Sequence, residues 1–170
     1  MNLIFRLIGL LLTVFFRSKL DLLGESRINV QVWPNDLDIY GHMNNGRYLT
    51  IMDLGRFDLL VRTGLLKISA RHRWKPLVGS VTIRFRRSLD PFQKYELCTR
   101  ILCWDEKWFF MEQRFERNGN VFALAIVKGL FRGSAGNVPI RPALGELGYT
   151  KPSPSIPAAI QLWIHAENQL

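Results

Sequence analysis

The 170 residues of this chain fit one domain, because chains of this size bury enough surface for a single core and rarely divide into several. Hydrophobic residues make up 48% of the sequence and aromatic residues 12%, which predicts a folded core. The 23 Lys and Arg residues outnumber the 14 Asp and Glu residues, and the resulting +9 favours an anionic partner such as a nucleic acid, an anionic membrane surface or a phosphorylated cofactor without choosing among them.

The chain begins with an apolar segment from Leu3 to Phe16, which Arg6 interrupts and Arg17 and Lys19 follow. A membrane span needs roughly 20 residues, so about 14 are too few for a comfortable crossing. No small-residue cleavage site follows, which argues against a secretory signal. The remaining alternatives for residues 1–24 are a helix packed on the domain or on a dimer partner, a membrane-surface anchor, and a tilted span.

The next two elements are a strand and a long helix. Residues 27–33 alternate apolar with polar, which is the period of a half-buried strand, and Pro34 ends it. From Asn45 to Thr63, apolar and small residues recur at helical spacing, and Gly64 supplies a C-terminal stop.

The rest of the domain alternates with a period of two, which predicts four strands. They are expected at residues 81–86, 95–104, 108–117 and 121–132, with turns at 105–107 and 118–120. One strand, one long helix and four strands is an α+β order, in which an antiparallel sheet wraps around a helix over residues 25–135. The Pro-rich residues 136–170 are expected to form an appendage with a short helix at 158–168.

The two cysteines, Cys98 and Cys103, fit neither a CxxC redox pair nor a zinc half-site. On one regular strand their odd separation would point them to opposite faces, so they are expected to be buried or half-buried free thiols. No metal site is predicted.

The connection between the first strand and the helix is unusually rich in hydrogen-bonding groups. From Asp36 to Tyr48 it reads DLDIYGHMNNGRY, which has the form DxDxxGHxNNxxY. This run resembles the 4-hydroxybenzoyl-CoA thioesterase group of the hotdog superfamily. With residues 32–35 before it and 51–56 after it, the pattern is similar more narrowly to the thioesterase-superfamily-member-6-like branch.

This resemblance covers about residues 25 to 135 and implies both a fold and an activity. It implies a hotdog fold, with a curved antiparallel sheet of about five strands around one central helix. It also implies dimers or dimers of dimers that pair through the sheet, with active sites at the subunit boundary. The expected reaction is hydrolysis of a fatty or aromatic acyl thioester of coenzyme A or of an acyl carrier, with no cofactor other than the coenzyme A of the substrate.

Thioester hydrolysis develops negative charge on the carbonyl oxygen, and a helix N-terminus offers unpaired N–H groups and a partial positive charge. The resemblance gives the backbone N–H of Asn45 the oxyanion role, and Gly46 allows close approach. Tyr40, Asn44 and Tyr48 are assigned to substrate binding, although the place of Tyr48 on the apolar helix face also suits the core.

Two aspartates are candidates for the catalytic acid. Asp38 occupies the catalytic acidic position of one branch of the family, where it could attack the carbonyl carbon directly or deprotonate a water. Asp53, on the helix, matches the position that other hotdog thioesterases use. The structural alternatives are a turn-forming role for Asp36 and Asp38 and a surface or cross-dimer charge for Asp53.

His42 could bond Asp38 or the thioester, help to position Asn44, or bond a backbone carbonyl. Arg84 and Arg86 are expected to share one face of a strand, where they could hold the anionic nucleotide tail of coenzyme A or simply be solvated.

Three functions from different classes are compatible with these observations. The leading prediction is a cytoplasmic thioesterase with peripheral membrane contact through residues 3–16. The alternative is a non-catalytic acyl- or lipid-binding hotdog protein at a membrane surface. Nucleic-acid binding has only the basic excess to support it, because no recognised motif for it occurs, and no nucleic-acid partner is predicted.

Overall fold

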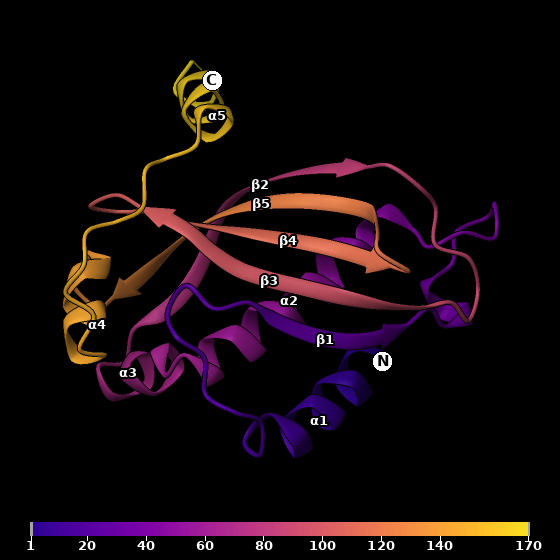
Figure 1. Cartoon of the computed structure of the whole chain (residues 1–170), viewed down its shortest axis with the longest axis horizontal. Coiled ribbons are helices and arrows are strands. Elements are labelled where there is room, and N and C mark those ends of the chain that lie inside the picture. The colour runs from indigo at the N-terminus through magenta and orange to yellow at the C-terminus, as the bar shows by residue number, and fades with distance from the viewer. Residues whose placement is uncertain (1, 170) are drawn as a thin grey trace.

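The structure is a computed structural model that describes residues 2–169 (Figure 1). In chain order its elements are α1 (Asn2–Val14), β1 (Ser26–Gln31), the 3-10 helix η1 (Pro34–Asp36), α2 (Asn45–Arg62), α3 (Leu65–Arg71), β2 (Lys75–Phe85), β3 (Lys94–Trp104), β4 (Phe109–Arg117), β5 (Asn120–Gly133), β6 (Gly136–Val138), α4 (Ile140–Glu146) and α5 (Ala158–Glu167).

One antiparallel sheet forms the body of the molecule, with its main strands in the order β1-β3-β4-β5-β2 and β6 added beside β5. Figure 1 shows the sheet curving around α2, which lies along its inner face. The predicted α+β class and the hotdog arrangement are therefore confirmed. In the sequence β3 and β4 separate β2 from β5, but β2 and β5 pair over almost their whole length.

Several elements differ from the sequence-based prediction, which also contained neither η1 nor β6. Strand β2 begins at Lys75, whereas the prediction began it at residue 81. The prediction missed residues 75–80 because a bulge between Val78 and Ser80 interrupts the alternation of apolar and polar residues on which it rested. Helix α3 was not predicted, since Gly64 ends α2 and also caps the next helix with φ +83°. Helix α4 was missed because Pro142 read as part of an irregular tail, whereas proline is tolerated in a first helical turn.

The core lies between α2 and the inner face of the sheet. Tyr48, Ile51, Met52 and Leu59 of α2 are each at most 2% exposed. A Cβ atom at Gly55 would lie 2.4 Å from Thr99 Oγ1 on β3, so glycine is what lets the helix approach the sheet this closely.

Helix α1 packs against α2 through one face, which carries Leu3, Leu7, Leu10 and Val14. Its other face is apolar but exposed, with Ile4, Phe5 and Leu12 at 61–70%. Phe15 and Phe16, which follow the helix, are 70% and 90% exposed. The segment is therefore a helix that contacts the domain with one face and leaves the other exposed. Within residues 2–169, no helix is long and apolar enough to cross a membrane.

The C-terminal chain covers part of the outer face of the sheet. Ile160 of α5 packs with Phe110 and Cys103, and Glu167 accepts a hydrogen bond from Lys128 Nζ at 2.7 Å. Both predicted thiols are free and buried.

The expectation that the two cysteines point to opposite faces is wrong. A second bulge, between Ile101 and Cys103, changes the parity of β3. Cys98 lies opposite Arg114 and Cys103 lies opposite Phe110, and these two partners share the outer face of β4.

Candidate functional site

The start of α2 presents a free backbone donor. Asn44 is the N-cap, and its Oδ1 accepts the Gly46 N–H at 2.9 Å. Asn45 is the first helical residue, and within residues 2–169 its N–H has no acceptor. The side chain of Asn44 therefore maintains the helix end, while the amide of Asn45 remains available for a developing oxyanion.

The loop that carries Asp38 folds back beside this helix end. A β-bridge joins Leu37 to Met43, and Asn44 N–H donates to Asp36 O at 2.8 Å. Asp38 N–H donates to His42 O at 2.8 Å, which closes the loop. The chain segment holding Asp38 therefore runs alongside the segment that enters α2.

The carboxylate of Asp38 is half-buried and only partly engaged. Its Oδ1 accepts the N–H groups of Tyr40 at 2.9 Å and His42 at 3.3 Å, which is the turn-forming role expected of such a residue. Among the described residues, Oδ2 has no hydrogen-bond or ion-pair partner. One oxygen thus orients the group and the other is free for chemistry.

Asp36 is fully buried and belongs to an ion cluster that the sequence did not reveal. Arg6 Nη2 lies 2.5 Å from its Oδ2, and Arg47 Nε donates to its Oδ1 at 3.0 Å. Trp33 N–H also donates to Oδ2, at 2.9 Å. The one usable signal was the single arginine inside the apolar run of α1, which must find a partner if that run is packed.

The side chains of the other predicted polar residues of the loop, His42 and Tyr40, make fewer contacts. His42 Nε2 lies 3.8 Å from Asp90 Oδ1 on the loop between β2 and β3, and the imidazole bonds neither the Asp38 carboxylate nor Asn44. Tyr40 is 78% exposed at the loop tip.

Tyr48 belongs to the core. It is 2% exposed and its ring packs against Phe85 and Phe115, which is the core position that its place on the apolar helix face also suits. Burial raises the pKa of its hydroxyl to about 12, which keeps it neutral.

Asp53 lies elsewhere on α2, at the mouth of an apolar pocket. It is ion-paired with Arg56, whose Nη1 donates to Gln113 Oε1 at 2.8 Å. Burial lowers the pKa of Arg56, and the charge of Asp53 acts in the opposite direction. The pocket has a volume of about 200 Å³ and lies between α2, α3, β2 and β4; its apolar lining is Phe57, Leu60, Leu66, Pro76, Leu77, Val78, Phe109 and Met111.

Arg84 lies on β2 and Arg86 lies just after its last residue, and both are exposed. Ile83 before them is half-buried, and Phe85 between them is 40% exposed, although the edge of its ring contacts Tyr48. In the described part of the chain, neither arginine side chain has an ion-pair partner, so both are available to an anion.

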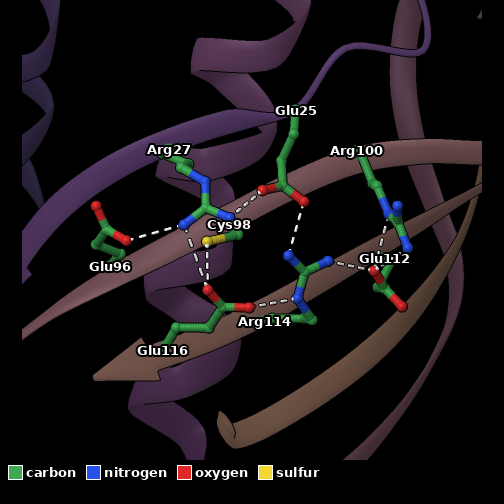
Figure 2. Close-up of polar contacts among 8 residues, drawn as sticks. All are labelled: Glu25, Arg27, Glu96, Cys98, Arg100, Glu112, Arg114 and Glu116. Carbon is green, nitrogen blue, oxygen red and sulfur yellow. Dashed lines mark hydrogen bonds and ion pairs between the residues drawn. The ribbon is translucent and has the colours of Figure 1, made fainter. Parts of the chain in front are cut away.

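One cluster has the spacing of a metal site, on the outer face of the sheet (Figure 2). Ligand atoms of Glu96, Cys98 and Glu116 lie within 4.8 Å of one another. However, Arg27 lies 3.0 Å from Glu96 and 3.4 Å from Glu116, and it would repel a cation there. Burial, with the charge of Glu116, raises the pKa of Cys98 to about 12, whereas a metal requires the thiolate. The cluster is better described as an ion-pair network between β1, β3 and β4.

Comparisons with known proteins agree with this architecture. The model of the thioesterase-like superfamily matches residues 32–164. Protein THEM6 from Danio rerio is 39% identical over 127 residues, which cover 72% of this chain and 63% of that protein. Protein THEM6 from Xenopus laevis is 36% identical over 144 residues, which cover 85% of this chain and 69% of that protein.

Among solved structures, the probable thioesterase YbaW from Escherichia coli superposes with a TM-score of 0.66 at 21% identity, over 72% of this chain and 96% of that one. That likeness concerns the fold, whereas the family match covers most of the sequence. The match to the zebrafish protein spans less than two thirds of that relative's length. Taken with the hotdog fold and the motif before α2, these matches mean that the chain belongs to the thioesterase-like superfamily, in its THEM6-like branch.

Proposed function

We propose that this protein hydrolyses acyl thioesters, with coenzyme A as the leaving group. The observation that carries the proposal is the free N–H of Asn45 at the start of α2, next to a loop that holds one unpaired oxygen of Asp38. The amide would stabilise the oxyanion, for which a preorganised donor typically contributes about 10²–10³-fold in rate.

Asp38 supplies the second half of the reaction. Its carboxylate either attacks the carbonyl carbon and expels the thiolate to leave a mixed anhydride, or takes a proton from a water that attacks instead. In the first case water then cleaves the anhydride and regenerates the carboxylate. Asp53 is the competing candidate, and its place at the apolar pocket suits a role near the acyl group of the substrate.

The pocket beside Asp53 is the proposed site of the acyl group. Its volume of about 200 Å³ exceeds the roughly 150 Å³ of a dry protein cavity that accommodates benzene. An aromatic ring or a medium-length acyl chain therefore fits it. Arg84 on β2 and Arg86 just after that strand are the proposed contacts for the phosphates of coenzyme A.

Thiol release from a panel of aromatic and fatty acyl-CoA esters tests this function. Steady turnover of at least one member supports it. Tight binding of acyl-CoA without turnover of any member would favour the alternative, a non-catalytic acyl-binding protein.

A homodimer is the proposed assembly, because the free edge of the sheet is apolar. Strand β2 pairs with β5 on one side, and its exposed residues include Leu77, Val78 and Phe85, each at least 40% exposed. An uncovered apolar edge is a template for pairing with another strand. We expect light scattering to give twice the 19.7 kDa mass of one chain, or a multiple of that dimer; a monomer at micromolar concentration would contradict the assembly.

A membrane surface is the proposed partner of the exposed face of α1. Phe5 and Leu12 on that face are 70% and 69% exposed, and Lys19 follows the helix. Burial of one such side chain contributes about 1.5–3 kcal/mol. We therefore expect the double variant Phe5→Asp, Leu12→Asp to lose binding to anionic phospholipid vesicles by about 10-fold or more in a sedimentation assay.

A matched control for this test is Leu162→Asp, which changes an equally exposed apolar residue on α5, at 71%. This variant should bind vesicles like the unmodified protein. Equal binding by the double variant and the unmodified protein would exclude the surface of α1 as the contact.

A further inference from the structure

Helix α1 is joined to the domain by two arginines, each of which reaches a fully buried aspartate. Near its N-terminal end Arg6 pairs with Asp36, and just beyond its C-terminal end Arg17 pairs with Asp58, both at 2.5 Å. Each aspartate also forms an ion pair with an arginine of α2: Arg47 pairs with Asp36, and Arg62 pairs with Asp58. Each attachment is therefore a buried aspartate between one arginine at an end of α1 and one arginine from α2, although Arg6 is 10% exposed and Arg17 is 30% exposed.

They differ in what each aspartate holds. Asp58 lies on α2 and accepts a hydrogen bond from the Ser26 hydroxyl of β1, away from the loop of Asp38. Asp36 lies inside that loop, two residues before Asp38. Its backbone oxygen accepts the N–H of Asn44, and its side chain accepts from Trp33 and Arg47, so it ties the loop to the first turn of α2.

Arg6 completes this junction from outside the hotdog core. Its Nη2 donates both to Asp36 and to Gln31 O, at 2.7 Å, which bridges the loop to the end of β1. Its side chain is only 10% exposed, and the carboxylate that it meets is 0% exposed. Without Arg6 the buried carboxylate would have a single cationic partner and could turn toward Arg47, which would shift both segments that it holds.

We infer that Arg6 is a positioning residue for the site formed by Asp38 and the Asn45 amide, acting through Asp36. The inference rests on the proposed thioesterase function. It makes the N-terminal helix part of the active-site framework, although α1 contributes no group that touches the substrate. Misplacement of reacting groups by about 1 Å can cost roughly 10²-fold in rate.

The test compares Arg6→Met with Arg17→Met, which removes the equivalent arginine at the other end of α1. We expect Arg6→Met to lower kcat by about 10- to 100-fold with KM changed by no more than about 3-fold, and Arg17→Met to leave kcat within about 3-fold. Arg6→Lys should restore most of the lost kcat, because the ammonium can still pair with Asp36. If Arg6→Met does not fold, Arg6→Gln takes its place.

Hydrogen exchange supplies a readout that does not depend on turnover. Backbone amides of residues 36–47 should exchange faster in Arg6→Met but not in Arg17→Met. Equal kcat and equal exchange in the two variants would overturn the inference. If the unmodified protein hydrolyses no acyl-CoA, the proposed function fails, and the exchange comparison still decides whether Arg6 positions the loop.

Discussion

Replacing Asp38 by asparagine is expected to lower kcat for the preferred acyl-CoA by about 10²–10⁴-fold, which is the range for loss of a positioned acid or base. The asparagine amide has the same shape, and its oxygen can still accept the N–H groups of Tyr40 and His42, so the loop should keep its conformation. What disappears is the free oxygen that attacks the carbonyl or accepts a proton from water. KM should therefore change by only a few fold.

Two conservative variants serve as controls for this result. Asp90→Asn removes the charge that faces the His42 imidazole, and turnover should be nearly unchanged, because that imidazole has no contact with the Asp38 carboxylate, which meets only the backbone N–H of His42. Asp53→Asn decides between the two acids. If Asp38→Asn retains full turnover while Asp53→Asn loses it, the chemistry belongs to the pocket on α2, and the role assigned to Asp38 is wrong.

The fold could be predicted because its signals are local. Residues 45–63 carry a helical period and the later strands carry a period of two, and the structure confirms both. The prediction failed where a single bulge changed the parity of a strand. The bulge near Gly79 concealed the first half of β2, and the bulge at residue 102 brought Cys98 and Cys103 to one face. Bulges depend on neighbouring strands, which a local pattern does not contain.

The parts of the site that could be predicted are those that come from neighbouring residues in the sequence. The helix start at Asn45 and the folded-back loop of Asp38 come from one continuous motif, and the cap at Asn44 is its direct consequence. The ion pair between Arg6 and Asp36 was not predictable, because the two residues are 30 positions apart and each had an ordinary explanation. An apolar helix tolerates one arginine at its edge, and an aspartate before a helix is a common turn former.

The largest effect on stability is expected from the buried ion pair between Asp58 and Arg17, which is the second attachment of α1. Asp58 is fully buried on α2 and pairs with Arg17 at 2.5 Å and Arg62 at 3.4 Å, while Ser26 donates to its second oxygen. Asp58→Ala removes the only carboxylate recorded for these groups in residues 2–169. Breaking a buried ion pair by deleting one partner costs about 3–5 kcal/mol. We expect a loss of that size in the free energy of unfolding measured with urea.

Asp53→Ala is the matched control, because it removes an aspartate from the same helix that also pairs with an arginine. The side chain of Asp53 is 59% exposed, whereas that of Asp58 is 0% exposed. Exposed pairs contribute about 0–1 kcal/mol, because water solvates each charge almost as well as its partner does. Equal losses in the two variants would mean that burial does not set the strength of these pairs, and that Asp58 does not hold α1 and β1 to the central helix. A loss confined to Asp58→Ala would make the buried carboxylates, and not the apolar contacts alone, the reason that α1 remains attached while its outer face stays exposed.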